Sequence, residues 1–458
     1  MIMSCKLNQE SVLEKVRNGR LDAITLSQSN LVDDIILSMY RNGILQCISK
    51  GFPDYRAKNI TIPHELNIAF MCAAKMKVHS SLTDIPAAIT DHKVLNEIGY
   101  SMYEANSNLV SNLTRESNLR SLLGMYHSED FVISYNTTVQ QLIFPIMNIL
   151  PNIHILDCTK ITVPLKNKNY EGSGIGVDND GHTARGYKLV SLRGLAGDGG
   201  IIEEIGLGPL NEHDLHLANK TLHNTQVLKP GDLLIMDRGF ISRELVNFLK
   251  NDLMVDVYIP LRENMDAYNM AVSATKIENK WQAHPNKKRS SQKIAFASDI
   301  GSFWQTTMSP HKDAPLNACV VWDTISNKYH VFVTTDTKKT AKQIVQTYEL
   351  RWEIEEDFRQ MKDFWKLGKV TSTMFHMVTF HIVFTLLGYL LFQLYTMLPD
   401  GELFLRKSLP VVLKNYQPKY VGVYVVYSGD EFALLNFAEF YSSCDDRTKS
   451  LMCRILHV

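Results

Sequence analysis

The sequence predicts an α/β protein whose helices come first and whose strands begin near residue 150. Residues 11–18 and 30–40 carry apolar side chains three and four positions apart, which is the spacing of one helix face. From Ile153 onward, short segments rich in β-branched residues alternate with helical ones, as in a sheet flanked by helices. Between residues 261 and 328 the strand-like segments follow one another more closely, which indicates a β-rich insertion.

A chain of 458 residues has room for two to four domains at roughly 150 residues each. Within the first region, residues 81–95 fit either a helical hairpin or a helix-turn-helix. The expected organisation is a helical region over 1–150, an α/β domain in two parts over 151–260 and 329–399, the β-rich insertion over 261–328 and a C-terminal region over 400–458.

The individual elements follow from composition and turn residues. The expected strands cover 153–163, 187–195, 200–207, 231–237, 254–260, 292–296, 303–307, 318–322, 329–334 and 420–427, and the first three form an antiparallel meander. A loop rich in Gly and Asn is expected over 166–186. Helices are expected over 242–250, as one long element over 340–364, and over 403–415 with a break at Pro410.

Charge and cysteine usage exclude several classes of protein. Lys plus Arg and Asp plus Glu number 48 each, so an evenly basic surface is excluded, although local basic patches are not. The seven cysteines are widely spaced and contain no Cys-x-x-Cys pair, which argues against a disulfide framework or a thiolate zinc site. The first residues resemble no secretory signal, so we expect a cytoplasmic protein.

Residues 370–399 contain no charged side chain, and 378–398 are long enough to cross a bilayer. The same stretch holds Thr379, His381 and Thr385, which would need protein partners in lipid. We therefore expect a buried core helix and no membrane association.

Four side chains with different chemistry share one face of the expected long helix. Tyr348, Arg351, Glu355 and Lys362 are separated by steps of three, four and seven residues. Such a face can hold a metal ion and a phosphate chain together, although a salt-bridged solvent face has the same pattern. The neighbouring acids Glu353, Glu356 and Asp357 point away from this face by their spacing.

Two aspartates occupy positions where an isolated charge is costly. Asp157 lies inside an apolar strand and Asp237 ends another. Carboxylate oxygens suit Mg²⁺, and two such ions can activate a nucleophile and stabilise the leaving oxygen of a phosphodiester. Two strand aspartates and a helix glutamate, Glu355, are the ligands that this chemistry requires.

The order Asp157, Asp237, Glu355 on strand, strand and helix resembles the DDE transposases. The spacing Tyr-x2-Arg-x3-Glu-x6-Lys is similar to the signature of one bacterial insertion-sequence branch, and Asp237-Arg-Gly-Phe resembles its second aspartate motif. Arg262 resembles an arginine that follows the next strand in that branch. The resemblance covers about residues 150–400 and implies a ribonuclease-H-like catalytic domain, a mixed sheet flanked by helices.

The resemblance implies an enzyme that cleaves DNA at transposon ends and transfers the 3′-OH ends to target DNA. Asp157, Asp237 and Glu355 would be catalytic and bind two Mg²⁺ ions, for which Mn²⁺ can substitute. Tyr348, Arg351 and Lys362 would contact phosphates, and Tyr329 or His330 could stack a displaced base. The implied partners are terminal inverted repeats, target DNA and a second copy of the chain in the DNA complex, with no small-molecule cofactor and a nucleoid-associated location.

Two alternatives stay open: a metal-dependent nuclease of the same fold without strand transfer, and a DNA-binding derivative without catalysis. We expect residues 1–150 to bind DNA and residues 400–458 to support dimerisation. A basic loop over 280–298 contains no acid. Its residues Lys287, Lys288 and Arg289 fit either a phosphate contact or a solvated loop.

Overall fold

The computed structural model describes residues 5–56, 63–98, 103–104, 108–109, 116–196, 199–301, 313–419, 422–447 and 449–450. Contacts divide the chain into two compact units. One comprises Met1–Ser134, Phe364–Thr371 and His376–Val458, and the other comprises Tyr135–Asp363 and Ser372–Phe375. The domain boundaries given above from the sequence stay predictions.

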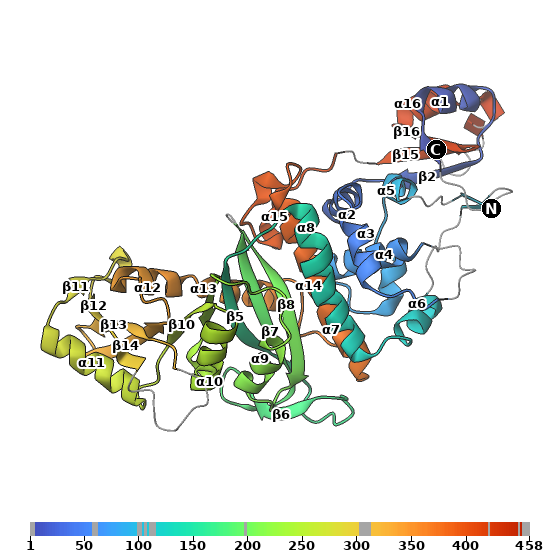
Figure 1. Ribbon diagram of the computed structural model, residues 1–458. Helices are drawn as coiled ribbons and strands as arrows, with labels where there is room; N and C mark the ends of the chain where they lie inside the picture. The colour runs from blue at the N-terminus through green and yellow to red at the C-terminus, as the bar shows by residue number, and fades with distance from the viewer. Residues whose placement is uncertain are drawn as a thin grey trace. The chain divides into compact units, whose positions relative to one another are not determined.

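The first unit is mainly helical but includes a sheet built from both ends of the chain (Figure 1). Its four strands run in the order β1-β16-β15-β2, and α1 and α16 pack against it. The strands are β1 (Lys6–Leu7), β2 (Ala23–Ser27), β15 (Val423–Ser428) and β16 (Glu431–Leu435), with a separate pair β3 (Tyr103–Glu104) and β4 (Asn108–Leu109).

The two helices predicted near residues 11–18 and 30–40 are present in this unit as α1 and α2. The helices of the unit are α1 (Gln9–Arg17), α2 (Leu31–Arg41), α3 (Ile44–Gly51), α4 (His64–Met76), α5 (His92–Glu97), α6 (Glu116–Leu123), α7 (Ser128–Thr137, ending in the second unit), α14 (Phe375–Met397), α15 (Leu409–Asn415) and α16 (Phe437–Ser443), with 3-10 turns η1 (Leu82–Ala87) and η7 (Glu402–Phe404). Residues 81–95 therefore form neither of the two motifs considered, because a 3-10 turn stands where the first α-helix was expected.

Pro410 does not break a helix. It stands in the first turn of α15, where its missing N–H and fixed φ fit, so the prediction of a broken helix over 403–415 was wrong. The apolar segment forms α14, the one helix among the described residues that is long and apolar enough to cross a membrane. Its most apolar window is 89% buried inside the protein, as expected of a core helix.

The polar groups of α14 have protein partners. The Lys75 ammonium donates to Nδ1 of His381 at 3.1 Å, and Nε2 of His381 donates to the Leu367 carbonyl at 3.2 Å. The Thr385 hydroxyl donates to the backbone carbonyl of His381 at 2.7 Å. These bonds satisfy the His381 and Thr385 side chains, two of the groups that would make a lipid environment costly.

The second unit contains a ten-stranded mixed sheet in the order β11-β12-β13-β14-β10-β9-β5-β7-β6, with β8 also paired to β7. Its strands are β5 (Ile153–Val163), β6 (Gly174–Val177), β7 (Thr183–Ala196), β8 (Gly199–Pro209), β9 (Leu233–Met236), β10 (Asp256–Pro260), β11 (Gln282–Ala283), β12 (Gln292–Ala297), β13 (Asn317–Asp323) and β14 (Lys328–Thr334). Only β5, β9 and β10 run parallel to one another, and the other pairs are antiparallel.

Helices flank this mixed sheet, which confirms the predicted α/β class (Figure 1). Side chains from α9, α10 and α11 join the strands in one large apolar core, while α12 and α13 pack on other strand residues. The elements are η2 (Thr138–Ile143), α8 (Phe144–Met147), α9 (Asp214–Leu222), η3 (Arg238–Phe240), α10 (Arg243–Asn247), η4 (Phe248–Asp252), α11 (Asp266–Glu278), η5 (Lys287–Arg289), α12 (Ala341–Glu349) and α13 (Trp352–Asp363).

In three segments of this unit the structure differs from the prediction, leaves it open or does not describe the residues. The region 166–186 is not one loop, because β6 and the first residues of β7 form a hairpin there. Gly186 of β7 allows β5 to approach closely, since a Cβ at this position would lie 2.0 Å from the Ile161 carbonyl oxygen. Residues 261–328 add α11 and three strands to the same sheet, and their status as an insertion stays a prediction. The strand expected over 303–307 lies outside the described residues.

The expected single helix over 340–364 is two helices. The backbone between α12 and α13 tightens: the amide of Leu350 donates to Thr347 and that of Arg351 to Tyr348, so three-residue bonds replace four-residue bonds. The prediction was wrong because periodicity does not reveal this local change, and Arg351 stands at the junction.

A buried histidine ties the opening residues of β5 to β8 and β9. His154 lies between two carboxylates, with Nδ1 2.5 Å from Glu203 and Nε2 3.2 Å from Asp232. Burial lowers the pKa of His154, but the two carboxylates outweigh this effect and raise it to about 9.

This pKa predicts how stability depends on pH. Because the folded pKa lies above the ordinary 6.5, the charged ring stabilises the fold fully below about pH 6.5, and this contribution is lost as the pH rises through 9. The stability difference between the parent and His154→Gln should shrink by roughly 2–3 kcal/mol between these values. Urea unfolding of both proteins at each pH measures it, and a constant difference would contradict the charged state of His154.

Candidate active site

Two aspartates lie at the same level of neighbouring parallel strands. Leu156 on β5 is in register with Met236 on β9, so the next residues, Asp157 and Asp237, follow at adjacent positions. Leu156 and Met236 pack in the core shared with α9 and α10. Because side chains alternate along a strand, Asp157 faces the side of the sheet that carries α13, where Arg351 reaches it.

The Asp157 carboxylate has two nitrogen donors. Oδ1 accepts from the amide of Cys158 at 2.7 Å, and Oδ2 accepts from Nη1 of Arg351 at 2.9 Å. Burial most strongly, and then the charges of Asp237 and Glu355, raise the pKa of Asp157 to about 6, while Arg351 and the Cys158 amide oppose this increase. Three carboxylates therefore influence one another at this place.

Asp237 follows β9 and caps a 3-10 turn. Its Oδ1 accepts from the amide of Arg238 at 2.7 Å, which orients the side chain at the end of the strand. Glu355 lies on the exposed face of α13 and accepts a short hydrogen bond from Nη2 of Arg351. The Arg351 guanidinium thus bridges Asp157 and Glu355, which belong to the sheet and the helix respectively.

The other two members of the predicted helix face also lie near these acids. The Tyr348 ring centroid is 6.0 Å from Cζ of Arg351, and burial raises the pKa of the phenol, with Asp237 and Asp157 adding to the effect. Burial lowers the pKa of Lys362, and the charge of Lys160 lowers it further. The structure therefore brings together the three predicted acids, Tyr348, Arg351 and Lys362.

Lys160 was missed by the sequence reasoning. It lies on β5 three residues after Asp157, and its ammonium donates to the carbonyl of Asp178 at 3.2 Å. A lysine inside a mostly apolar strand and close to a strand aspartate could have been identified as a candidate site residue, because burying its charge is costly unless it has a partner.

Asp237 lines a cavity of about 810 Å³ together with Arg238, Arg262, Tyr329 and His330. Nε of Arg262 donates to the carbonyl of Arg238 at 3.3 Å, so Arg262 lies next to the residue that follows Asp237. The structure places this predicted residue near the acids. The cavity wall combines two guanidinium groups with aromatic rings, which suits a phosphate and a base.

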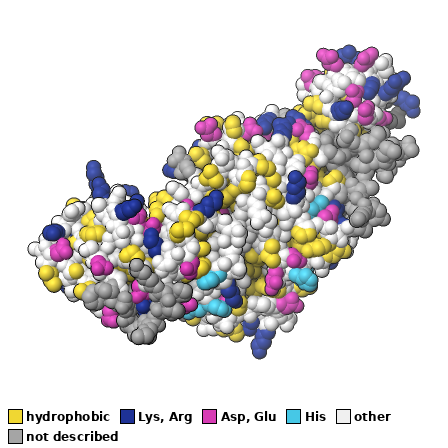
Figure 2. Space-filling model, in the orientation of Figure 1, with side chains coloured by type: hydrophobic (Ala, Val, Ile, Leu, Met, Phe, Trp, Pro, Cys, Tyr) yellow, Lys and Arg dark blue, Asp and Glu magenta, His cyan; other side chains and the backbone are white. Residues whose placement is uncertain are grey.

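The basic loop lies elsewhere on the sheet and is anchored to α12. Nε of Arg289 is 3.4 Å from a carboxylate oxygen of Glu349, and the Asn286 amide donates to the same oxygen at 3.3 Å. Lys287 and Lys288 are exposed, and Figure 2 shows Lys and Arg side chains projecting over the part of this unit that holds β11 and β12. Since Glu349 follows Tyr348, the loop is tethered beside the helix that leads to the site.

The neighbouring acids on α13 have structural partners. Glu353 and Asp357 both bind Arg193 of β7, while Glu356 pairs with Arg359 one turn further along the helix. Their side chains are therefore engaged away from Asp157, as their spacing indicated.

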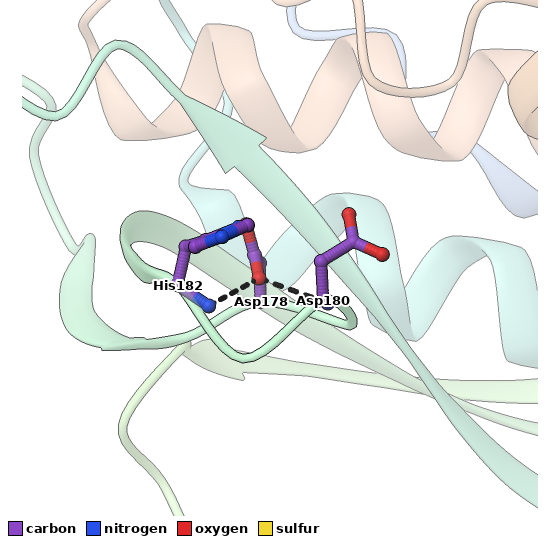
Figure 3. Close-up of side chains that lie close together, drawn as sticks. All are labelled: Asp178, Asp180 and His182. Atoms are coloured by element: carbon purple, nitrogen blue, oxygen red, sulfur yellow. Dashed lines mark hydrogen bonds and ion pairs between the residues drawn. The ribbon is translucent and has the colours of Figure 1, made fainter.

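A second group of metal-type ligands occurs in the turn between β6 and β7 (Figure 3). Asp178, Asp180 and His182 are, among the described residues, the group of three or more such side chains whose ligand atoms lie within 4.8 Å of one another. Oδ1 of Asp178 accepts from the amides of Asp180 and His182 at 2.9 and 2.8 Å, so this carboxylate closes a tight exposed turn.

The comparisons with known proteins concern the same part of the chain. A family model described as the transposase DDE domain matches residues 150–391, which is more than half of the chain and includes all three predicted acids. A search of curated proteins gave no match. Because the match covers more than half of the chain, the chain belongs to the family of transposases with a DDE domain.

Proposed function

We propose that the protein is a DNA transposase that cleaves phosphodiester bonds at the ends of its element and transfers the 3′-OH ends to target DNA. Asp157, Asp237 and Glu355 are the catalytic acids and hold two Mg²⁺ ions. The observation that supports this most is that Asp157 and Asp237 directly follow the paired residues Leu156 and Met236 on parallel strands, with Glu355 joined to Asp157 through Arg351.

The donor set fits divalent cations. All three groups offer carboxylate oxygens, the ligands that Mg²⁺ and Mn²⁺ prefer. Burial, and after it the charges of Asp237 and Glu355, raise the pKa of Asp157, and a bound cation would favour its charged form. We assign the metal-binding function to this group because the strand β5, the end of β9 and the helix α13 each supply one of its carboxylates, whereas in the exposed turn Oδ1 of Asp178 accepts from two backbone amides of the turn itself. When bound, the ions would stabilise the attacking and leaving oxygens of an in-line displacement.

The cationic residues of the same face would hold the DNA. Arg351 pairs with both Asp157 and Glu355, and it is placed to exchange these carboxylates for a phosphate. Lys362 is partly buried beside Lys160, so a phosphate there would relieve the repulsion between two ammonium groups. Tyr348 has a phenolic hydroxyl near the acids and completes the Tyr-Arg-Glu-Lys set of the insertion-sequence branch.

The remaining parts are proposed to bind DNA and a second copy of the chain. Arg262 and the cavity beside Asp237 would contact the transposon end. Residues 1–150 are proposed to read the terminal inverted repeats and 400–458 to support dimerisation. Because β1 and β2 share a sheet with β15 and β16, the two ends of the chain fold together, and neither can be deleted without exposing the other. Under this proposal, the protein is encoded by a bacterial insertion sequence and acts in the cytoplasm in association with the nucleoid.

A cleavage and joining assay tests the function. Purified protein, paired element ends and target DNA are incubated with Mg²⁺, and labelled products are separated by size. Cleaved ends joined to target DNA support a transposase. Cleavage without joining would favour the nuclease, and binding without cleavage the idle derivative. The element ends used in the assay would be the short inverted repeats expected in the DNA that flanks the gene.

The basic loop gives a prediction about affinity. Changing Lys287, Lys288 and Arg289 together to alanine should weaken DNA binding for all sequences and flatten its salt dependence. The variant would make fewer phosphate contacts, so its binding would release fewer counterions from the DNA. A salt titration measured by gel shift compares the variant with the parent. Changing Lys328 and Lys338, which are exposed but lie outside this loop, serves as the control. An unchanged slope in the loop variant would identify a solvated loop.

A further inference from the structure

A buried arginine joins the catalytic helix to the sheet. Arg193 lies on β7 and is 5% exposed, and its guanidinium contacts two acids of α13. Nη1 lies 2.8 Å from Glu353 and Nε lies 2.5 Å from Asp357. A buried guanidinium without partners would be costly, so these two bonds hold it in one place.

The sheet leaves room for this guanidinium. A Cβ on Gly200, at the start of β8, would lie 2.2 Å from Cζ of Arg193, closer than any side chain permits. Leu195 of β7 pairs with Gly200, so the arginine lies over the glycine backbone two residues further along. The absence of a side chain at Gly200 therefore allows Arg193 to lie flat against the sheet and reach α13.

Arg193 lies close in position to a candidate acid on each of two elements, Asp157 on β5 and Glu355 on α13. Arg193 is in register with Ile155, two residues before Asp157 on β5. Its partners stand two residues before and two residues after Glu355 on α13. A step of two residues turns about 200° around a helix, so Arg193 grips the face of α13 opposite to Glu355.

We propose that Arg193 is a positioning residue that sets the separation of Glu355 from Asp157. Because the two acids that Arg193 binds lie one helical turn apart, Arg193 fixes both the rotation of α13 about its axis and the position of α13 along β5. The inference rests on the proposed metal-binding function of these acids. It differs from a general contribution to stability, because it predicts a change in metal affinity in a protein that stays folded.

The experiment compares metal binding and cleavage in matched variants. Arg193→Gln keeps the hydrogen-bonding character of the side chain but removes the charge and the fork, and Asp357→Asn removes one partner while retaining Arg193. Glu356→Gln is the control, since Glu356 pairs on the exposed side of the same helix. Mn²⁺ binding is followed by the loss of the free-ion electron paramagnetic resonance signal, and cleavage is followed over a range of Mg²⁺ concentrations.

We expect Arg193→Gln to weaken Mn²⁺ binding about tenfold and to raise the Mg²⁺ concentration for half-maximal cleavage by a similar factor, the effect of losing a partner that orients metal ligands. Asp357→Asn should shift both in the same direction, and Glu356→Gln should shift neither. DNA binding by gel shift should be unchanged in all three. Arg193→Lys should recover part of the affinity, because the charge returns without the fork.

The outcomes separate this inference from the proposed function. If the parent binds Mn²⁺ and Asp157→Asn does not, the metal-binding function holds. Unchanged midpoints in folded Arg193→Gln and Asp357→Asn would then overturn the positioning role alone. If Arg193→Gln does not fold, Asp357→Asn decides by the same comparison. A parent that binds no Mn²⁺ and cuts no DNA would contradict the proposed function itself.

Discussion

Replacing Glu355 with glutamine, or Asp157 or Asp237 with asparagine, is expected nearly to abolish DNA cleavage. The amide keeps the shape of the side chain but removes the charge that would hold Mg²⁺, so the two-ion site cannot form. The loss should exceed the roughly 100-fold effect of removing an outer-shell partner. DNA binding should survive, because phosphate contacts elsewhere supply most of the affinity. Cleavage of paired ends in Mg²⁺ and a gel shift on the same samples measure both.

The control variants lie on the same helix. Glu356→Gln should cut DNA at nearly the parent rate, since Glu356 pairs with Arg359 in solvent. Glu353→Gln should retain substantial cleavage, because the more buried Asp357 still holds Arg193. If Glu355→Gln cut normally while Glu356→Gln or Glu353→Gln did not, the assignment of the helix face would be wrong. Normal cleavage by all of these variants would remove the transposase proposal.

The core of the candidate site could be predicted because its signals are local. Asp157 stands inside the largely apolar strand β5, and Asp237 directly follows the short apolar strand β9, so both charged residues are conspicuous in the sequence. Arg351 and Glu355 are one helical turn apart and do form an ion pair. The contacts therefore follow from spacing, even though the helix that was expected to carry them is divided at Leu350.

The fold was less predictable where strands pair across long separations. Ala23–Ser27 pairs with Val423–Ser428, and no feature of either segment identifies the other. Pairing of this kind depends on tertiary packing, which a single sequence does not display. The same limit applies to β6, which is four residues long and rich in glycine, so its composition matched a loop.

The contacts of Arg193 could not be predicted for a related reason. Glu353 and Asp357 were set aside because their spacing turns them off the Glu355 face, and in the structure both bind Arg193. Spacing gives no information about what the opposite face of the helix meets. A lone arginine in the apolar segment 187–195 was the one available signal, and its partner lies more than 150 residues later in the chain.

Arg351→Lys is expected to lower cleavage to between the rates of the parent and of Glu355→Gln. Lysine keeps one positive charge but cannot bridge Asp157 and Glu355 with two nitrogens, nor bind a phosphate through a fork. Loss of one charged hydrogen bond is worth roughly 1.5–3 kcal/mol, so cleavage should fall about 10- to 100-fold. Single-turnover cleavage at saturating DNA measures it.

Arg359→Lys provides the matched control, because Arg359 is on the same helix and pairs with Glu356 in solvent. It should cut DNA like the parent. If Arg351 exchanges the carboxylates for a phosphate during the reaction, Arg351→Lys should slow cleavage even when DNA is saturating. If saturating DNA restored the parent rate, Arg351 would be a binding contact only, and the bridge between Asp157 and Glu355 would have no part in the chemistry. If Arg351→Lys and Arg359→Lys slowed cleavage equally, the effect would arise from the stability of α13 and not from the site.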